Sequence, residues 1–460
     1  MTITANLSTR LASLVGSERV LSSEADLQKY AVADRVPTVI AKAASAEEVA
    51  EVVRFAAAEK LTAVCCGSRS KLEIGMPPRG YDLALDLSGL AQIAHYDPAD
   101  LTLSVDAGFP LAALSKVLAA KGQFLPLSVP FFNTSTVGGT IASGIDSMLR
   151  LQYGTSRDFL IGAEFVDGKG QLCRSGGRVV KNVTGYDIHK LLIGSLGTLA
   201  AITRLNFRTF PLPETRAGFL ASFSTPEAAL SFRKTLLDSG LPFSAVELFN
   251  PELAVLLSGS LKQGNVPAAE LLNPSGWFVY AAFSGQEAVV ARVGRESKDR
   301  ANKAGTVGEL LDQGTNDRFG EALRETFNWL KQSAPNVILL RLVLQKQFTT
   351  ADLADLRRLA QASPRGPALL LNGCGICLLA FLCEGDATKD REALEPGVSG
   401  VFSRVPSTAA TATLLHAPAW LKAKCGVWGP VPPDFPLMQR VKSAFDPYTV
   451  FSPGRFVGGL

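Results

Sequence analysis

The chain has 460 residues, a formal net charge of +4, 47% hydrophobic residues and 19% charged residues. The small net charge argues against a nucleic-acid-binding protein, which usually carries a concentrated basic face. The apolar content excludes a long disordered chain and provides material for a sizeable core. At roughly 150 residues per domain, the length allows about two or three domains.

Neither a secreted nor a membrane-spanning protein is expected. Seven cysteines are an odd number and do not describe a disulfide framework. Residues 1–13 lack the basic and apolar stretches of a secretion signal. Residues 366–383 carry no charge over a length that could span a bilayer, but the run contains Pro367, Asn372 and two glycines. We therefore predict buried strand there, no transmembrane segment, and a cytoplasmic location.

The first part of the chain alternates strands and helices. Residues 37–41 form a short apolar strand, and Ser45 precedes an amphipathic stretch with Glu48 placed as in a capping box. This pattern predicts a helix from Ala46, followed by a strand over residues 61–65. The next segment is the loop 66–71.

Alternating apolar and polar residues predict half-buried strands over residues 83–87 and 101–105. The turn 167–170 between two further strands indicates a hairpin. A proline-containing boundary falls at residues 210–214, and beyond it repeated strand and helix patterns predict an antiparallel sheet covered by helices. The fold class is α+β.

Three segments rich in glycine and hydroxyl residues are the most informative feature: residues 66–71, 133–144 and 194–199. Glycine lets backbone N–H groups approach phosphate oxygens closely, because no Cβ intervenes. Arg69 and Lys71 add positive charge beside the first segment. Each segment alone is also consistent with an ordinary turn, whereas the three together favour a ligand site.

The common nucleotide-binding fingerprints are missing. Residues 373–378 begin like a dinucleotide glycine motif but lack the third glycine and lie inside a strand pattern. No GxxxxGK[ST] phosphate loop occurs in the sequence. A nicotinamide-dependent enzyme with a Rossmann fold is therefore not expected.

The order of these segments resembles the FAD-binding domain of the vanillyl-alcohol oxidase and p-cresol methylhydroxylase (PCMH) superfamily. The segments that carry this resemblance are residues 67–71, 135–139 with 143–144, 153–158, 161–164 and 194–199. A more specific resemblance is to the smaller FAD-binding subunit of bacterial glycolate oxidase. It is carried by residues 177–187 and by the terminal segments 445–447 and 452–455.

The resemblance implies a two-lobed PCMH-type FAD-binding domain followed by an α+β, ferredoxin-like cap domain. It divides the chain into an N-terminal segment 1–30, an FAD-binding domain 31–212, a cap domain 213–430, and a segment 431–460 that returns to the FAD domain. Residues 67–71 and 136–139 would hold the pyrophosphate, Ser143 and Gly144 would lie beside the flavin or ribityl chain, and Ile202 would bind the adenine side through its backbone. The implied FAD-binding residues are Gly67, Ser68, Arg69, Ser70, Lys71, Thr136, Val137, Gly138, Gly139, Ser143, Gly144 and Ile202. The first loop contains no histidine, so non-covalent FAD is expected.

Catalytic and metal-binding candidates are few. The chain has three histidines, of which His95, in an expected turn, and His189, in a helix-like run, are predicted to be solvated surface residues. His416 is the candidate base of the second domain, with a packed structural histidine as the alternative. Cysteine spacings do not suit a metal or an iron–sulfur cluster, so we expect buried, inert thiols and no metal site.

Three functional hypotheses follow from the resemblance. In the first, the chain is the FAD-binding subunit of a glycolate oxidase-like complex that oxidises glycolate or another small 2-hydroxy acid. Its partners would be a larger FAD-containing catalytic subunit and an iron–sulfur subunit, through which it would lie at the inner face of the membrane. The alternatives are a stand-alone FAD-dependent 2-hydroxy acid dehydrogenase or oxidase, and a non-catalytic flavin-binding scaffold. The small number of histidines favours the first and third hypotheses.

Overall fold

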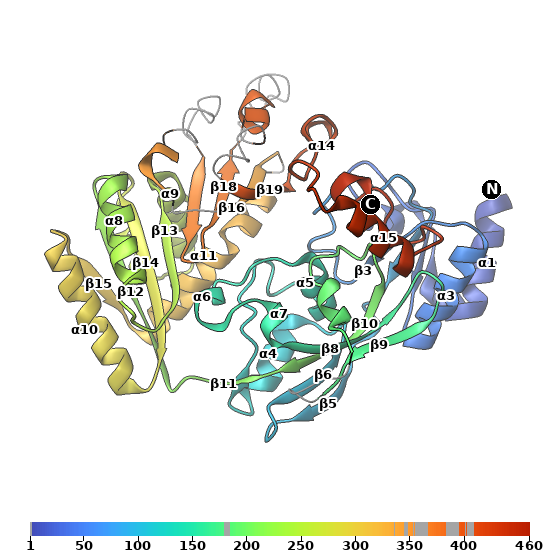
Figure 1. The fold of residues 1–460 in the computed structure, drawn as a ribbon, viewed down its shortest axis with the longest axis horizontal. Helices are drawn as coiled ribbons and strands as arrows, with labels where there is room; N and C mark the ends of the chain where they lie inside the picture. The colour runs from blue at the N-terminus through green and yellow to red at the C-terminus, as the bar shows by residue number, and fades with distance from the viewer. Residues whose placement is uncertain are drawn as a thin grey trace.

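The computed structural model describes residues 2–178, 185–334, 336–344, 348–352, 354, 367–382, 395–400, 402 and 409–460. Figure 1 shows two parts that face each other. We call them the first lobe, whose sheets come from residues 20–211, and the cap, whose sheet comes from residues 215–416. The exact domain divisions given above stay a prediction.

The first lobe begins with a four-stranded sheet in the order β1-β2-β4-β3, in which β2, β4 and β3 are parallel. Helices α1 and α3 pack on this sheet through a shared apolar cluster. The predicted strand–helix–strand unit is confirmed, and the Ser45 hydroxyl accepts a hydrogen bond from the Glu48 N–H at 3.1 Å. The elements are α1 (Thr2–Val15), η1 (Ser17–Arg19), β1 (Val20–Leu21), α2 (Glu24–Gln28), β2 (Val39–Lys42), α3 (Ala46–Ala58), β3 (Ala63–Cys66) and β4 (Leu83–Asp86).

A second, antiparallel sheet completes the first lobe in the order β5-β6-β10-β8-β9. The predicted hairpin is confirmed as β8 and β9. Strands β7 and β11 form a short ribbon at the exit to the cap. The elements are β5 (Ile93–Asp97), β6 (Thr102–Asp106), α4 (Leu111–Ala119), β7 (Gln123–Phe124), α5 (Val137–Ser143), α6 (Arg150–Tyr153), α7 (Ser156–Phe159), β8 (Leu160–Val166), β9 (Leu172–Gly176), η2 (Ile188–Leu191), β10 (Ala201–Arg208) and β11 (Phe210–Pro211).

Two strands are more buried than their alternating sequences predict. Every residue of β4 and of β6 is buried, so the expectation of half-buried strands at 83–87 and 101–105 is wrong. The reason is position, because β4 lies between β2 and β3, and β6 lies between β5 and β10. A central strand with both faces covered buries its polar positions as well, here Asp86 and Asp106.

The cap is an eight-stranded antiparallel sheet in the order β15-β12-β14-β13-β17-β18-β16-β19. Helices α8 and α10 cover one face and α9 and α11 the other, each through its own apolar cluster. A ferredoxin-like arrangement of the cap stays a prediction. The elements are β12 (Thr215–Phe223), α8 (Pro226–Leu237), β13 (Phe243–Phe249), α9 (Pro251–Gln263), η3 (Pro267–Leu271), β14 (Trp277–Gly285), α10 (Glu287–Lys303), β15 (Gly308–Leu311), α11 (Gln313–Ser333), β16 (Ile338–Leu344), β17 (Ala368–Asn372), β18 (Ile376–Phe381) and β19 (Ala409–His416).

The charge-free run 366–383 contributes β17 and β18, joined by the turn at Gly373–Gly375, and its two ends lie outside the described residues. This agrees with the predicted buried strand. In the part of the chain that the structure describes, no helix is long and apolar enough to cross a bilayer.

The C-terminal segment returns to the first lobe, where Figure 1 shows it in red beside β3. The Ala63 backbone donates to the Val450 carbonyl and accepts from the Ser452 N–H. Val450 and Phe451 are fully buried in the cluster beneath the first sheet. Segments that precede and follow the cap in the sequence therefore pack together in the first lobe. The last elements are α14 (Ala419–Cys425), α15 (Phe435–Phe445) and η4 (Val457–Gly459).

Candidate cofactor pocket and adjoining cavity

The three glycine- and hydroxyl-rich segments meet at a pocket of about 90 Å³ in the first lobe. We call it the cofactor pocket. Ten of the twelve predicted FAD-binding residues line it, together with Cys65, Leu196, Gly197 and Arg455. The ten are Gly67, Ser68, Arg69, Ser70, Lys71, Thr136, Gly138, Gly139, Ser143 and Ile202.

The two remaining predicted residues lie elsewhere. Gly144 lines the adjoining cavity described below, beside Gly194. The Val137 side chain is fully buried in the core of the first lobe, so only its backbone is available to a ligand. Val137 opens α5, whose Thr136 N-cap hydroxyl accepts from the Gly139 N–H at 3.2 Å.

Two glycines of the pocket are required by close packing. A Cβ on Gly67 would lie 2.4 Å from Thr136 Oγ1, and a Cβ on Gly138 would lie 2.5 Å from the Ala107 Cβ. A side chain at Gly138 would require the backbone of Ala107 to move, and one at Gly67 would require the Thr136 side chain to move. Bare backbone and short hydroxyl side chains at the wall suit the oxygen-rich pyrophosphate of FAD.

Arg69, which the sequence placed among the cofactor-binding cations, points toward the protein. Its guanidinium lies 3.5 Å from Asp86 and 4.3 Å from the centre of the Tyr30 ring. The Tyr30 hydroxyl donates to the same carboxylate at 2.5 Å. Asp86 therefore offsets much of the Arg69 charge, and Arg69 holds its loop with a left-handed backbone (φ 66°).

Arg455 is the charged residue of the cofactor pocket that is absent from the predicted set. Its buried guanidinium donates to the carbonyls of Leu72, Ile74 and Met76, and burial lowers its pKa to about 10. Among the described residues, no carboxylate lies within 4 Å of it. The terminal Ser-Pro-Gly-Arg sequence was noticed in the resemblance, but its position against residues 72–76 required the fold.

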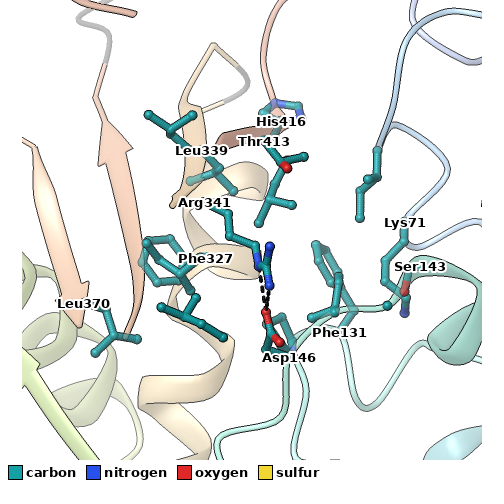
Figure 2. A pocket seen from close by; sticks show the side chains of 18 of the residues that line it. Lys71, Phe131, Ser143, Asp146, Phe327, Leu339, Arg341, Leu370, Thr413 and His416 are labelled. Carbon is teal, nitrogen blue, oxygen red and sulfur yellow. Dashed lines mark hydrogen bonds and ion pairs between the residues drawn. The ribbon is translucent and has the colours of Figure 1, made fainter. Parts of the chain in front are cut away.

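A larger cavity of about 270 Å³ lies between the first lobe and the cap, and we call it the cap cavity. It adjoins the cofactor pocket, because Ser70, Lys71 and Ser143 line both. Figure 2 shows Lys71 and Ser143 on one side of this cavity and Leu370 on the other. The rest of the wall is mainly apolar, with Ile74, Phe131, Met148, Leu323, Phe327, Leu339, Leu370, Ile376, Leu378, Leu415, Trp428 and Phe456 among its residues.

Lys71 lies at the junction of the two spaces. Its ammonium donates to the hydroxyls of Ser135 and Ser70, and no carboxylate lies within 4 Å of it among the described residues. Burial lowers its pKa to about 7, while Glu325 acts weakly in the opposite direction. A buried cation bonded only to hydroxyl groups is a ready partner for an anion.

Glu73, Lys331 and His416 form a second charged group on the cavity wall. Glu73 Oε2 lies 2.8 Å from the His416 Nδ1 and 2.8 Å from the Lys331 Nζ. The imidazole first, and then the ammonium, lower the pKa of Glu73 to about 2 despite partial burial. A carboxylate thus lies at the Nδ1 edge of His416, the one histidine among the described residues that line this cavity.

A third group joins the two parts of the molecule. Arg341 of β16 donates its Nε–H to Asp146 of the first lobe at 2.6 Å, as the dashed lines in Figure 2 show. Asp146 also pairs with Arg150. The charge of Arg341 is therefore largely offset, in contrast to that of Lys71.

The three histidines do not all lie where the sequence predicts. His95 is exposed as predicted, but it lies in strand β5 and not in a turn. The prediction that His189 is a surface residue is wrong: it is buried in η2, with Nδ1 3.0 Å from the Ser175 hydroxyl. Strand β9 supplies that hydroxyl partner, and burial lowers the pKa of His189. His416 lines the cap cavity.

Of the six cysteines among the described residues, Cys66 and Cys377 are buried as predicted, and Cys65, Cys173, Cys374 and Cys425 lie between buried and exposed. Burial raises the pKa of Cys65 and of Cys377 to about 12. Within the described residues, no group of three or more His, Cys, Asp or Glu side chains is arranged to hold a metal ion. The predicted glycolate-oxidase-like segment 177–187 lies partly outside the described residues, since 179–184 are not described.

Comparison with known proteins agrees with this geometry. Residues 37–176 match the family model "FAD binding domain". The chain is 34% identical over 223 residues to "Glycolate oxidase subunit GlcE" of Escherichia coli K12, a match that covers 48% of this chain and 62% of that relative. It is 24% identical over 435 residues to "Glycolate oxidase subunit GlcD" of Bacillus subtilis 168, covering 91% and 89% of the two chains.

The fold matches that of p-cresol methylhydroxylase, with a TM-score of 0.78, 16% identity, and coverage of 99% of this chain and 97% of the other. The protein thus has a PCMH-type α+β fold with an FAD-binding domain. Together with its relatives, this identifies the chain as an FAD-dependent oxidoreductase.

Proposed function

We propose that the chain oxidises a 2-hydroxy acid with non-covalent FAD and acts as the FAD-binding subunit of a glycolate oxidase-like complex. The observation that carries the proposal is the junction at Lys71. One unpaired buried ammonium lines both the cofactor pocket and a cavity that also contains the Glu73–His416 pair. An anionic substrate bound at this junction would lie beside both the cofactor pocket and a histidine.

FAD, when bound, supplies the two-electron acceptor for the hydride that leaves carbon 2 of the substrate. In this proposal the twelve predicted residues hold FAD, eleven from the first two segments and Ile202 from β10. Lys71, which lines both spaces, also binds the substrate carboxylate. His416 takes the proton of the 2-hydroxyl group, so that the product is the 2-oxo acid. The Glu73 carboxylate orients the ring and stabilises the imidazolium formed by that proton transfer.

The partners are proposed from the relatives. Both are named subunits of glycolate oxidase, which supports an assembly with a larger FAD-containing subunit. We further propose an iron–sulfur subunit as the electron acceptor and, through these partners, a cytoplasmic location at the inner face of the membrane. Because this chain has a substrate-sized cavity with a candidate base, we place oxidation of the substrate within it.

The first experiment is anaerobic addition of glycolate and D-lactate to the purified, FAD-loaded chain. Loss of the flavin absorption band is the expected result, and slow reoxidation by oxygen would favour the subunit over a self-sufficient oxidase. A chain that stays oxidised alone but is reduced with its co-purified partners would place catalysis elsewhere in the complex. A chain that dithionite reduces but no 2-hydroxy acid reduces, with or without partners, contradicts the proposal and favours a scaffold.

His416→Gln tests the base. We expect the rate of flavin reduction to fall about 100-fold, within the usual contribution of a positioned base, with little change in FAD content. His95→Gln is the matched control, because His95 is exposed on β5 and lines neither space. Equal rates in the two variants would remove His416 from the mechanism.

A further inference from the structure

The cap wall of the cavity is wider than a two-carbon substrate requires. Residues of β13, β17, β18, β16 and β19 line it, and these strands are neighbours in the sheet. Because side chains alternate between faces, Arg341, Leu378 and Leu370 share the cavity face as directly paired residues of three adjacent strands. Three strand spacings separate β16 from β13, which is about 14 Å at the usual spacing of about 4.8 Å.

The middle of this wall is apolar. Leu370, Leu378, Phe327 and Leu323 line it and belong to one apolar cluster between the sheet and α11, and Figure 2 shows Phe327 beside Leu370. These four side chains offer no polar group to the hydroxyl or carboxylate of glycolate. An apolar chain that displaces water there would be favoured.

Glu247 lies at the far end of the wall, on β13 opposite Asn372 of β17. Its side chain is 1% exposed, and among the described residues its Oε2 has no hydrogen-bond partner. Figure 2 places Leu370, on the strand next to β13, on the side of the cavity away from Lys71 and Ser143. Glu247 therefore offers an unused polar atom on the strand that follows that of Leu370 in the sheet, counted away from β16.

The surroundings of Glu247 define the group it would bind. Burial raises its pKa to about 8, so near neutral pH the carboxyl group carries its proton and can donate a hydrogen bond. Arg233, the nearest cation, is not within 4 Å and donates to the Asn372 carbonyl. Its positive charge disfavours a cationic ligand group, whereas a neutral hydroxyl or carbonyl meets no opposing charge.

We propose that the cap cavity binds a 2-hydroxy acid with a long apolar carbon chain that ends in a neutral hydrogen-bonding group, and that Glu247 binds this group. The inference rests on the proposed oxidation of 2-hydroxy acids and specifies the substrate class of that site. The carboxylate lies at Lys71, the chain crosses the wall at Leu378 and Leu370, and the far group reaches Glu247.

The test compares kcat/KM for glycolate, D-lactate, 2-hydroxyoctanoate and 2,8-dihydroxyoctanoate, using the full FAD-loaded chain and an artificial electron acceptor. We expect 2-hydroxyoctanoate to exceed D-lactate at least tenfold, and the terminal hydroxyl to add about threefold or more. The gain in kcat/KM from the terminal hydroxyl should vanish in Glu247→Leu and persist in Glu247→Gln. Glu309→Gln, exposed on β15 of the same sheet, is the matched control.

The outcomes separate the inference from the function on which it rests. Faster turnover of glycolate or D-lactate than of 2-hydroxyoctanoate would overturn the inference and leave the proposed function standing. A terminal-hydroxyl gain that survives in Glu247→Leu would also overturn it. If dithionite but no 2-hydroxy acid reduces the flavin, the proposed function fails. Ligand-induced changes in the flavin spectrum then decide whether 2-hydroxyoctanoate binds in a Glu247-dependent manner, and absence of such binding overturns the inference too.

Discussion

The cofactor pocket and the cap cavity adjoin, yet they are built in opposite ways. The pocket is made largely of glycines and short hydroxyl residues from loops whose unusual composition is visible in the sequence. The cavity is made of long charged and apolar side chains brought together from both parts of the molecule, such as Asp146 and Arg341, which are 195 residues apart. Most residues proposed to bind FAD are thus marked by local sequence, whereas those proposed to bind the substrate are brought together by the packing of the cap on the first lobe.

The largest effect on function is expected from placing a side chain on a glycine of the cofactor pocket. In Gly138→Val the new Cβ would meet the Ala107 Cβ at 2.5 Å and the Ala107 carbonyl at 2.9 Å, so the wall must move. We expect FAD affinity to fall more than about 100-fold, equivalent to roughly 3 kcal/mol. The ratio of flavin to protein absorbance after gel filtration measures this.

The control for that variant is Gly259→Ala in α9 of the cap, where a new Cβ meets nothing within 4 Å. Because alanine favours helix, this change should leave FAD content intact and stabilise the fold by about 0.5–1 kcal/mol. Normal FAD content in Gly138→Val would show that the pocket is not the cofactor site.

Arg455→Met tests whether the C-terminal segment shapes the pocket. The variant removes the donors to the carbonyls of Leu72, Ile74 and Met76, which hold the segment next to the first loop. Hydrogen bonds from a charged group contribute about 1.5–3 kcal/mol, so we expect FAD affinity to fall about 10- to 100-fold. Titration of the apoprotein with FAD, followed by flavin fluorescence, gives the dissociation constants.

Arg440→Met on α15 is the control for Arg455, because Arg440 is exposed in the same terminal segment. Its affinity for FAD should equal that of the unchanged chain. Arg455→Lys should recover part of the loss, since an ammonium can still donate to carbonyl groups. If Arg455→Met and Arg440→Met bind FAD alike, the segment has no positioning role.

Lys71→Met tests whether the lysine that lines both the cofactor pocket and the cap cavity is a desolvated cation. In the apoprotein the pKa of Lys71 is about 7, below the value of about 10.4 in an unfolded chain. Between these values the unfolded state binds one more proton, so Lys71 makes stability rise with pH by about 1.4 kcal/mol per pH unit from pH 7 to 10. Lys422, whose burial lowers its pKa to about 8, adds a similar term above pH 8 in both proteins.

Urea unfolding of apoprotein at several pH values should therefore show a smaller slope above pH 7 in Lys71→Met than in the unchanged chain. Lys121→Met, an exposed lysine, is the control. A bound anion favours the charged ammonium, so FAD or a 2-hydroxy acid should reduce the slope in the unchanged chain only. Identical slopes in the unchanged chain and Lys71→Met would mean that Lys71 is not a desolvated cation.

The same contrast explains what the sequence could predict. The capping of α3 by Ser45, and the glycine and hydroxyl composition of the three segments, depend on neighbours in sequence. The burial of β4 depends on strand order, which local patterns do not contain. His189 was misplaced for a related reason, because its hydroxyl partner comes from β9. The roles of Glu73, Glu247 and Arg341 likewise required the packing of cap on lobe.

The smallest effect is expected where the cavity touches solvent, at Glu73. Its pKa of about 2 lies below the usual value of about 4.3, so Glu73 stabilises the fold above pH 4 and this stabilisation is lost as pH falls toward 2. Because over a third of the side chain is exposed, we expect about 1 kcal/mol. Glu73→Gln should therefore reduce the fall in thermal stability that the unchanged chain shows between pH 5 and 3.

Glu59→Gln is the control, because its partner Arg10 is at the surface, and this variant should change that fall little. If stability falls between pH 5 and 3 as much in both variants as in the unchanged chain, Glu73 makes no electrostatic link between His416 and the first lobe. The proposed role of Glu73 in orienting His416 then loses its support.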